Sequence, residues 1–181
     1  ATLVWSRLKD STFILGVLCW LVSLMGSAYG AVTRQDGAMT SLARIVTGPD
    51  DAPTLVLLHG ITGSAVSLAE AIDHWVERGY RVVAVDARGH GLSPRWEPAE
   101  LERAGEVLVE DLIAVLEELE AASRGRAALG LPTPPAPVVI GHSMGAATAM
   151  VAAVRRPDLV TGVVLEDPAR FGTRSPRELL A

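Results

Sequence analysis

Four short apolar runs, separated by segments with helical periodicity, are the feature that most restricts the fold of this chain. They occupy residues 54–60 (TLVLLHG), 81–91 (RVVAVDARGHG), 137–141 (PVVIG) and 161–167 (TGVVLED). The start of each run lacks the polar alternation of a half-exposed strand, so we expect strands that are buried on both faces. Such strands occur in parallel sheets whose crossover connections are helices. The sequence therefore predicts an α/β fold with a mostly parallel sheet and helices on both faces.

Three segments between and after these runs have the 3.6-residue period of a helix: residues 64–78, 104–122 and 144–155. The second is strongly amphipathic, with one stripe formed by Leu108, Leu112, Leu116 and Leu119. Residues 124–137, rich in Pro and Gly, are expected to be a connector. Near the start, Asp36-Gly37 lies between two short extended runs, which predicts a hairpin.

Polar and glycine residues end each apolar run. In a parallel sheet the carboxyl ends of the strands meet at one edge, and ligands bind outside that edge. His59-Gly60, residues 86–91, residues 141–145 and Glu166-Asp167 are therefore expected to lie together. All the candidate chemistry of the chain falls on this edge.

Gly141-His142-Ser143-Met144-Gly145 stands between the third apolar run and a helix. The pattern Gly-x-Ser-x-Gly in that setting is typical of a tight, strained turn that lifts the serine hydroxyl above a sheet. The helix that follows directs its free N–H groups and positive dipole end toward any developing oxyanion. Ser143 is therefore our candidate nucleophile, and the alternative is a serine that only shapes a glycine-rich turn.

An acyl-transfer site also needs hydrogen-bond donors for the oxyanion. One donor usually comes from the residue after the nucleophile, here the backbone N–H of Met144. The loop after residues 54–58 supplies a second, which we assign to the N–H of Ile61, with Thr62 as the neighbour most suited to replace it. We interpret His59 as a structural residue that shapes this loop.

The sequences LVLLHGITGS, VVAVDARGHGLS, VVIGHSMG and GVVLEDPA occur in the order and spacing of the α/β-hydrolase superfamily. Over residues 31–170 the chain resembles most its single-domain esterase, lactonase and haloperoxidase-type branch. The resemblance implies a serine hydrolase without a cofactor, acting on a small ester, lactone or related carbonyl substrate. In this family the loop at residues 86–93 packs beside the oxyanion loop, so Arg88 and His90 are expected to be structural.

The catalytic histidine and acid are the missing parts. In the family the chain order is Ser, then Asp or Glu, then His. No histidine follows His142, whose side chain should point away from the Ser143 hydroxyl, and His74 lies inside a helix pattern. The general base is therefore not in this chain. Asp167 is a candidate acid, and the competing interpretation is that residues 166–168 only end a strand before proline.

Two explanations of the missing base stay open. In the first, the chain is part of a longer hydrolase, and residues 171–181 are the start of its lid. In the second, it is a short relative that has lost catalysis and binds a ligand or an interaction partner. In either case we expect little or no turnover from residues 1–181 alone.

The composition excludes several other classes of function. A net charge of −5 and a pI near 5.4 give no electrostatic basis for binding nucleic acid. Cys19 is the only cysteine, and the four histidines show no metal-ligand spacing, so neither a disulfide nor a metal site is expected. No pattern indicates an oligomeric state.

The N-terminal region differs from the rest in hydropathy. Residues 13–32 contain no charge and follow Arg7 and Lys9, which predicts a signal peptide or, if uncleaved, a membrane anchor within residues 1–30. The α/β core then spans residues 31–170. This interpretation places the protein in a membrane or outside the cell. The alternative is a buried apolar segment of a cytoplasmic domain.

Overall fold

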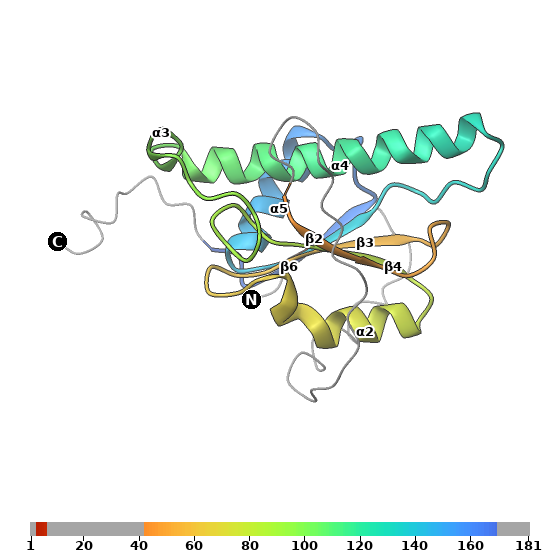
Figure 1. Cartoon of the computed structure of the whole chain (residues 1–181), viewed down its shortest axis with the longest axis horizontal. Helices are drawn as coiled ribbons and strands as arrows, with labels where there is room; N and C mark the ends of the chain where they lie inside the picture. The colour runs from red at the N-terminus through yellow and green to blue at the C-terminus, as the bar shows by residue number, and fades with distance from the viewer. Residues whose placement is uncertain (1–2, 7–41, 170–181) are drawn as a thin grey trace.

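A computed structural model of the chain describes residues 3–6 and 42–169. Its centre is a sheet with the strand order β1-β6-β5-β3-β4-β2 (Figure 1). The strands are β1 (Leu3–Ser6), β2 (Arg44–Thr47), β3 (Thr54–Leu58), β4 (Arg81–Val85), β5 (Val138–His142) and β6 (Gly162–Glu166). β6, β5, β3 and β4 are parallel to one another, whereas β1 and β2 pair antiparallel at the two edges. The predicted mostly parallel sheet is therefore confirmed.

Helices cover both faces of this sheet (Figure 1). A short 3-10 helix η1 (Ala65–Leu68) runs into α2 (Ala69–Glu77) on one face, and α4 (Ala104–Ala128) and α5 (Met144–Arg155) lie on the other. The short α3 (Pro98–Leu101) precedes α4. Right-handed crossovers explain this division, because the chain steps from β3 to β4 in one direction and afterwards moves across the sheet in the other.

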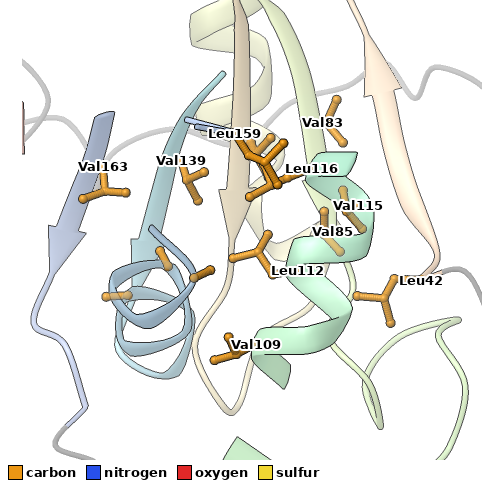
Figure 2. Close-up of a cluster of buried hydrophobic side chains, with 14 of the residues drawn as sticks. Leu42, Val83, Val85, Val109, Leu112, Val115, Leu116, Val139, Leu159 and Val163 are labelled. Carbon is orange, nitrogen blue, oxygen red and sulfur yellow. The ribbon is translucent and has the colours of Figure 1, made fainter. Parts of the chain in front are cut away.

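The side chains of the inner strands alternate between two cores. On β4, Val83 and Val85 join the core beneath α4 and α5, whereas Val82 and Ala84 join the core beneath α2. Figure 2 shows Leu112 and Leu116 of α4 beside Val83, Val85 and Val139 of the sheet. Both faces of these strands are thus buried, which explains why the sequence shows unbroken apolar runs.

The direction of the sheet reverses between β3 and β5. The chain leaves β3 for β4, and then crosses back over β3 to form β5 on its other side. In open α/β sheets the crevice outside the carboxyl ends of the strands, at such a reversal, is where ligands bind. The loop after β3 and the turn after β5 flank this crevice.

Helix α4 is longer than predicted. The connector was predicted to begin at residue 124, but residues 124–128 are the last residues of α4. The alanine-rich stretch around Gly125 stays helical. The helix ends at Ala128 and is terminated by Gly130, which has a φ of +69°. There the N–H of Gly130 donates to Ala127 O and that of Leu131 to Arg126 O, which is the usual glycine-terminated helix end.

Several predictions concern residues outside those that the structure describes. They are the hairpin at Asp36-Gly37, the apolar segment 13–32 and the lid start at 171–181. The sequence analysis did not anticipate β1, which falls in the region assigned to a leader or an anchor. Within residues 3–6 and 42–169, no helix has the length and apolar character needed to cross a bilayer. The leader or anchor at residues 13–32 stays a prediction.

Candidate active site

Ser143 lies at the turn between β5 and α5, with a backbone φ of 50° and ψ of −110°. Few non-glycine residues adopt a positive φ, so this conformation is strained. Its peptide groups are held on both sides. The Ser143 N–H donates to Glu166 O at 2.9 Å, and its carbonyl accepts from the N–H groups of Ala147 and Ala169 at 3.0 Å each. These bonds maintain the predicted strained turn.

The two glycines of the turn are required by close approach of backbone atoms. A Cβ at Gly141 would lie 2.5 Å from the carbonyl of Gly145. A Cβ at Gly145 would lie 2.6 Å from Leu58 O and 2.8 Å from His59 O, at the end of β3. The first turn of α5 therefore packs directly on β3, and only a residue without a side chain fits there.

The loop after β3, residues 59–64, lies against the serine turn. A Cβ at Gly60 would be 3.4 Å from Ser143 Cβ and 2.7 Å from His142 Nδ1. The Gly60 carbonyl accepts from the Gly63 N–H at 2.9 Å and faces His59 Nδ1 at 2.7 Å. Because the peptide bond is planar and trans, fixing this carbonyl also fixes the Ile61 N–H in the opposite direction.

Within the described part of the chain, neither of the two backbone donors assigned from the sequence has a hydrogen-bond acceptor. Met144 is the first residue of α5, so its N–H has no acceptor within the helix. Among residues 3–6 and 42–169, no hydrogen-bond acceptor is found for the N–H of Ile61. The side chain of Ile61 is 67% exposed, which places this residue at the rim of the site. Helix polarity adds a positive potential at Met144.

His59 is buried, and both of its ring nitrogens have partners. The Ala87 N–H donates to Nε2 at 3.1 Å, so the ring proton is assigned to Nδ1, which donates to Gly60 O. Burial lowers the pKa of the His59 imidazole; its bond to Gly60 raises the pKa by less, and nearby His90 lowers it. A neutral ring with both nitrogens engaged shapes the loop and has no free lone pair for the Ser143 proton.

We expect His59 to make stability depend on pH. Because its pKa is lowered on folding, the unfolded chain binds more protons than the folded one just below the ordinary histidine pKa of about 6.5. The free energy of unfolding should therefore fall as the pH decreases from 7.5 to 5.5, and by less in His59→Gln. Urea titrations at both pH values measure this difference.

A His74→Gln variant is the matched control for that experiment. Burial also lowers the pKa of His74, and Arg78 adds to the effect, so this histidine contributes with the same sign. Comparing the two variants separates the contributions. A His59→Gln protein that keeps the full pH dependence of the wild type would contradict the assignment.

The loop after β4, residues 86–93, is tied to the segment that follows β3, at the start of η1, by the buried carboxylate of Asp86. Its Oδ1 accepts from the Ala65 N–H at 2.7 Å and its Oδ2 from the Leu92 N–H at 2.9 Å. His90 Nε2 lies 2.8 Å from Ile61 O. The sequence analysis assigned this loop to the floor of the site but identified neither contact. An acid directly after a buried strand was the only signal for Asp86.

Arg88 anchors the same loop to α4. Its guanidinium donates to both carboxylate oxygens of Asp111, at 2.8 and 2.7 Å, and pairs with Glu100 at 3.1 Å. Hydrogen bonding to Asp111 is the main reason that the pKa of Arg88 is raised. The structural interpretation of Arg88 is consistent with these contacts.

Removing this anchor should destabilise the protein. We expect Arg88→Met to lower the free energy of unfolding by about 2–3 kcal/mol, because it leaves the half-buried Asp111 without its partner. Arg103→Met is the control, since Arg103 pairs with Glu110 at the surface and should contribute about 0–1 kcal/mol. Urea midpoints give both values. Equal effects of the two substitutions would refute the anchoring role.

The remaining candidates are placed as follows. His142 is exposed at the end of β5 with its ring against Gly60, and His74 lies in α2 on the other face of the sheet from α5. Asp167, exposed with a φ of 43°, follows β6 in the segment that bonds to the Ser143 backbone. Within the described ranges, no side chain donates to or accepts from the Ser143 hydroxyl.

A small, mostly apolar hollow lies beside the serine turn. Its walls include Leu42, Leu108, Met144 and Thr148, between the carboxyl ends of the strands and the helices α4 and α5. In the part of the chain that the structure describes, no group of three or more His, Cys, Asp or Glu side chains could hold a metal ion.

Comparison with known proteins identifies relatives of the chain. Residues 50–180 match the serine aminopeptidase (S33) family. The sn-1-specific diacylglycerol lipase ABHD11 of Mus musculus is 37% identical over 130 residues, which are 71% of this chain and 37% of that protein. Epoxide hydrolase B of Mycobacterium tuberculosis is 34% identical over 127 residues, which are 69% of this chain and 32% of that protein. The chain thus spans about a third of the length of these relatives.

A solved structure supports the fold. The thioesterase domain from the curacin biosynthetic pathway superposes with a TM-score of 0.56, over 72% of this chain and 42% of that one. At 24% sequence identity this likeness concerns the fold alone.

Proposed function

The chain belongs to the serine aminopeptidase (S33) family of α/β-fold hydrolases, and on this premise we propose that it carries the nucleophile and oxyanion-binding parts of a serine hydrolase. The substrate class that we propose is a small ester, lactone or related carbonyl compound. The observation that carries the proposal is the strained backbone of Ser143 at the N-terminus of α5, held by hydrogen bonds on both sides.

In this proposal Ser143 Oγ attacks the substrate carbonyl carbon. The N–H groups of Ile61 and Met144 stabilise the negative charge that develops on the carbonyl oxygen. The apolar hollow beside Met144 supports a substrate with an apolar portion. No cofactor takes part.

The general base is proposed to come from outside these 181 residues. Three of the four histidines are engaged or distant: His59 has both nitrogens engaged, His74 lies on the other face of the sheet, and His90 faces backbone carbonyls. The fourth, His142, has its ring against Gly60, and among the described residues it makes no hydrogen bond with the Ser143 hydroxyl. Asp167 is our candidate for the acid that orients the base, since its segment contacts the Ser143 backbone. A base in the gene sequence past Ala181 would complete the set.

A covalent probe tests the proposal. The protein encoded by the whole gene, treated with a fluorophosphonate, should gain one adduct, located on Ser143 by peptide mass spectrometry. Ser143→Ala should gain none, and Asp167→Asn should react more slowly if Asp167 is the acid. Since relatives are named for a lipase and an epoxide hydrolase, the substrate panel includes p-nitrophenyl esters, a diacylglycerol and an epoxide.

The alternative is a protein of the same fold that only binds a ligand or a partner. The observation that favours it is the absence of any side-chain partner for the Ser143 hydroxyl among residues 3–6 and 42–169. A folded product of the whole gene that stays unlabelled would support this alternative and refute the hydrolase proposal.

A further inference from the structure

We propose that His90 is a positioning residue for the oxyanion-binding loop, residues 59–64. Its ring holds the peptide group between Ile61 and Thr62 in the orientation that an oxyanion requires. This inference rests on the proposed function, because it assigns a role in the same site to a residue that the sequence analysis regarded as structural.

The loop contains a tight turn that packing alone does not fix. The Gly63 N–H donates to Gly60 O at 2.9 Å, which closes a four-residue turn with Ile61 and Thr62 at its centre. The side chain of Ile61 is 67% exposed, so few contacts restrain it. Turns of this kind have two forms that keep the closing hydrogen bond and differ by rotation of the central peptide. Hydrogen bonds to that peptide therefore decide its orientation.

His90 supplies such a bond from the neighbouring loop. Its Nε2 lies 2.8 Å from Ile61 O, closer than its Nδ1 lies to a carbonyl; because a neutral ring has one N–H and a carbonyl only accepts, we assign the proton to Nε2, which donates to Ile61 O. Nδ1 of the same ring lies 3.1 Å from Arg88 O, within the loop of His90 itself. The ring thus bridges the loop after β4 and the central peptide of the oxyanion turn.

The order of the strands indicates on which side of β3 the Ile61 carbonyl meets His90. β4, which is followed by the loop that contains His90, lies on one side of β3, and β5, which is followed directly by Ser143, lies on the other. If the bond draws the Ile61 carbonyl toward the β4 side, the trans peptide directs the Thr62 N–H, next to the proposed Ile61 donor, toward the side of Ser143. The rotated peptide would present a carbonyl oxygen there instead, and its negative end would repel a developing oxyanion.

The side chain of Thr62 favours the same orientation of the central peptide as the His90 hydrogen bond does. Rotation of the central peptide to the second turn form requires a positive φ at the third turn position, which a β-branched residue disfavours. Among the described residues, the non-glycine positions with positive φ are Ser143 and Asp167 and do not include Thr62. The observed form is thus favoured twice, by the Thr62 side chain and by the His90 hydrogen bond.

The test uses the protein encoded by the whole gene and a p-nitrophenyl ester. His90→Phe should lower kcat about 5- to 10-fold with KM changed less than about twofold, the size expected for one solvent-accessible hydrogen bond. Combined with Thr62→Gly, which permits the rotated peptide, the loss should exceed the product of the two single losses. His90→Gln, whose amide reaches about as far as Nε2, should restore most of the activity. His90→Asn is shorter and serves as the loss variant if His90→Phe does not fold.

Arg95→Met is the matched control. Arg95 also donates to backbone carbonyls, to Gly89 O at 2.6 Å and Gly91 O at 3.2 Å in the neighbouring loop, and among the described residues it makes no hydrogen bond to Ile61. It should keep wild-type kcat. An equal loss in Arg95→Met would show that only the rigidity of this loop matters, and would overturn the proposal.

A second measurement does not depend on activity. Hydrogen–deuterium exchange of the amides in residues 59–64 should become about 5- to 10-fold faster in His90→Phe and stay unchanged in Arg95→Met. Unchanged exchange in His90→Phe would overturn the proposal. If instead Ser143→Ala retained full activity, the proposed function would fail, and the exchange data would still decide whether His90 holds the turn.

Discussion

Ser143→Ala is expected to lower kcat of the whole-gene product for an ester substrate by about 10⁴- to 10⁶-fold, the range seen when the nucleophile of a serine hydrolase is removed. The substitution deletes one oxygen and leaves both proposed oxyanion donors, Ile61 and Met144, in place. KM should therefore change little, because ground-state binding does not depend on the attacking group. Steady-state kinetics with a p-nitrophenyl ester measure both constants.

Ser143→Gly is the control for that experiment, because it should lose the same activity but differ from Ser143→Ala in stability. It removes the same hydroxyl, so activity should be lost equally. The φ of 50° at Ser143 is strained for a residue with a Cβ but not for glycine, and relief of strain should outweigh the added entropy of the unfolded chain. We expect Ser143→Gly to be about 1 kcal/mol more stable than Ser143→Ala by urea titration. A less stable glycine variant would show that the turn is not strained.

Gly145→Ala is expected to have the largest effect on stability, lowering the free energy of unfolding by at least about 3 kcal/mol, the upper part of the range for overpacking. The added methyl group would lie 2.6 Å from Leu58 O and 2.7 Å from Leu58 Cβ. Because the first contact is with backbone of the central strand β3, no rotation of a flexible side chain can relieve it. The helix α5 must shift, and Ser143 with it. Thermal and urea unfolding measure the loss.

Gly125→Ala is the matched control in the same protein. Gly125 lies within α4, and a Cβ there would meet nothing within 4 Å. Alanine is the better helix former by about 1 kcal/mol, so this variant should be as stable as the wild type or more stable. If Gly145→Ala were equally tolerated, the close packing of α5 on β3 would be wrong.

The sequence predicted the parallel sheet and its helices because both rest on local patterns. The unbroken apolar runs arise because the inner strands are buried on both faces. The leucine stripe that begins at Leu108 arises because α4 is buried on one face only. The boundaries of α5 at Met144–Arg155 were also predicted, since the Gly-x-Ser-x-Gly turn fixes where the helix begins. Gly125 misled the prediction of α4, because the alanine-rich residues around it keep the chain helical.

Contacts between loops were beyond the sequence analysis. That His59 would receive the Ala87 N–H, or that His90 would meet Ile61 O, depends on the order of strands in the sheet rather than on any spacing. The resemblance predicted that the two loops pack together, but not which atoms meet. The roles of Ile61, Met144 and Asp167 remain predictions that the experiments above address.

Three hydrogen bonds between the segments after β3 and β4 span less of the chain than the contact of Gly60 with Ser143, and this has a consequence for the order of folding. The contacts Ala65–Asp86, His59–Ala87 and Ile61–His90 span 21, 28 and 29 residues. Contacts that span fewer residues tend to form earlier than contacts that span more, because closing a shorter loop costs less chain entropy. During synthesis from the N-terminus, both partners of each of these three bonds are therefore present before Ser143 has been added to the chain. The loop that carries the proposed Ile61 donor can therefore be in place before Ser143 and the second proposed donor, Met144, are added.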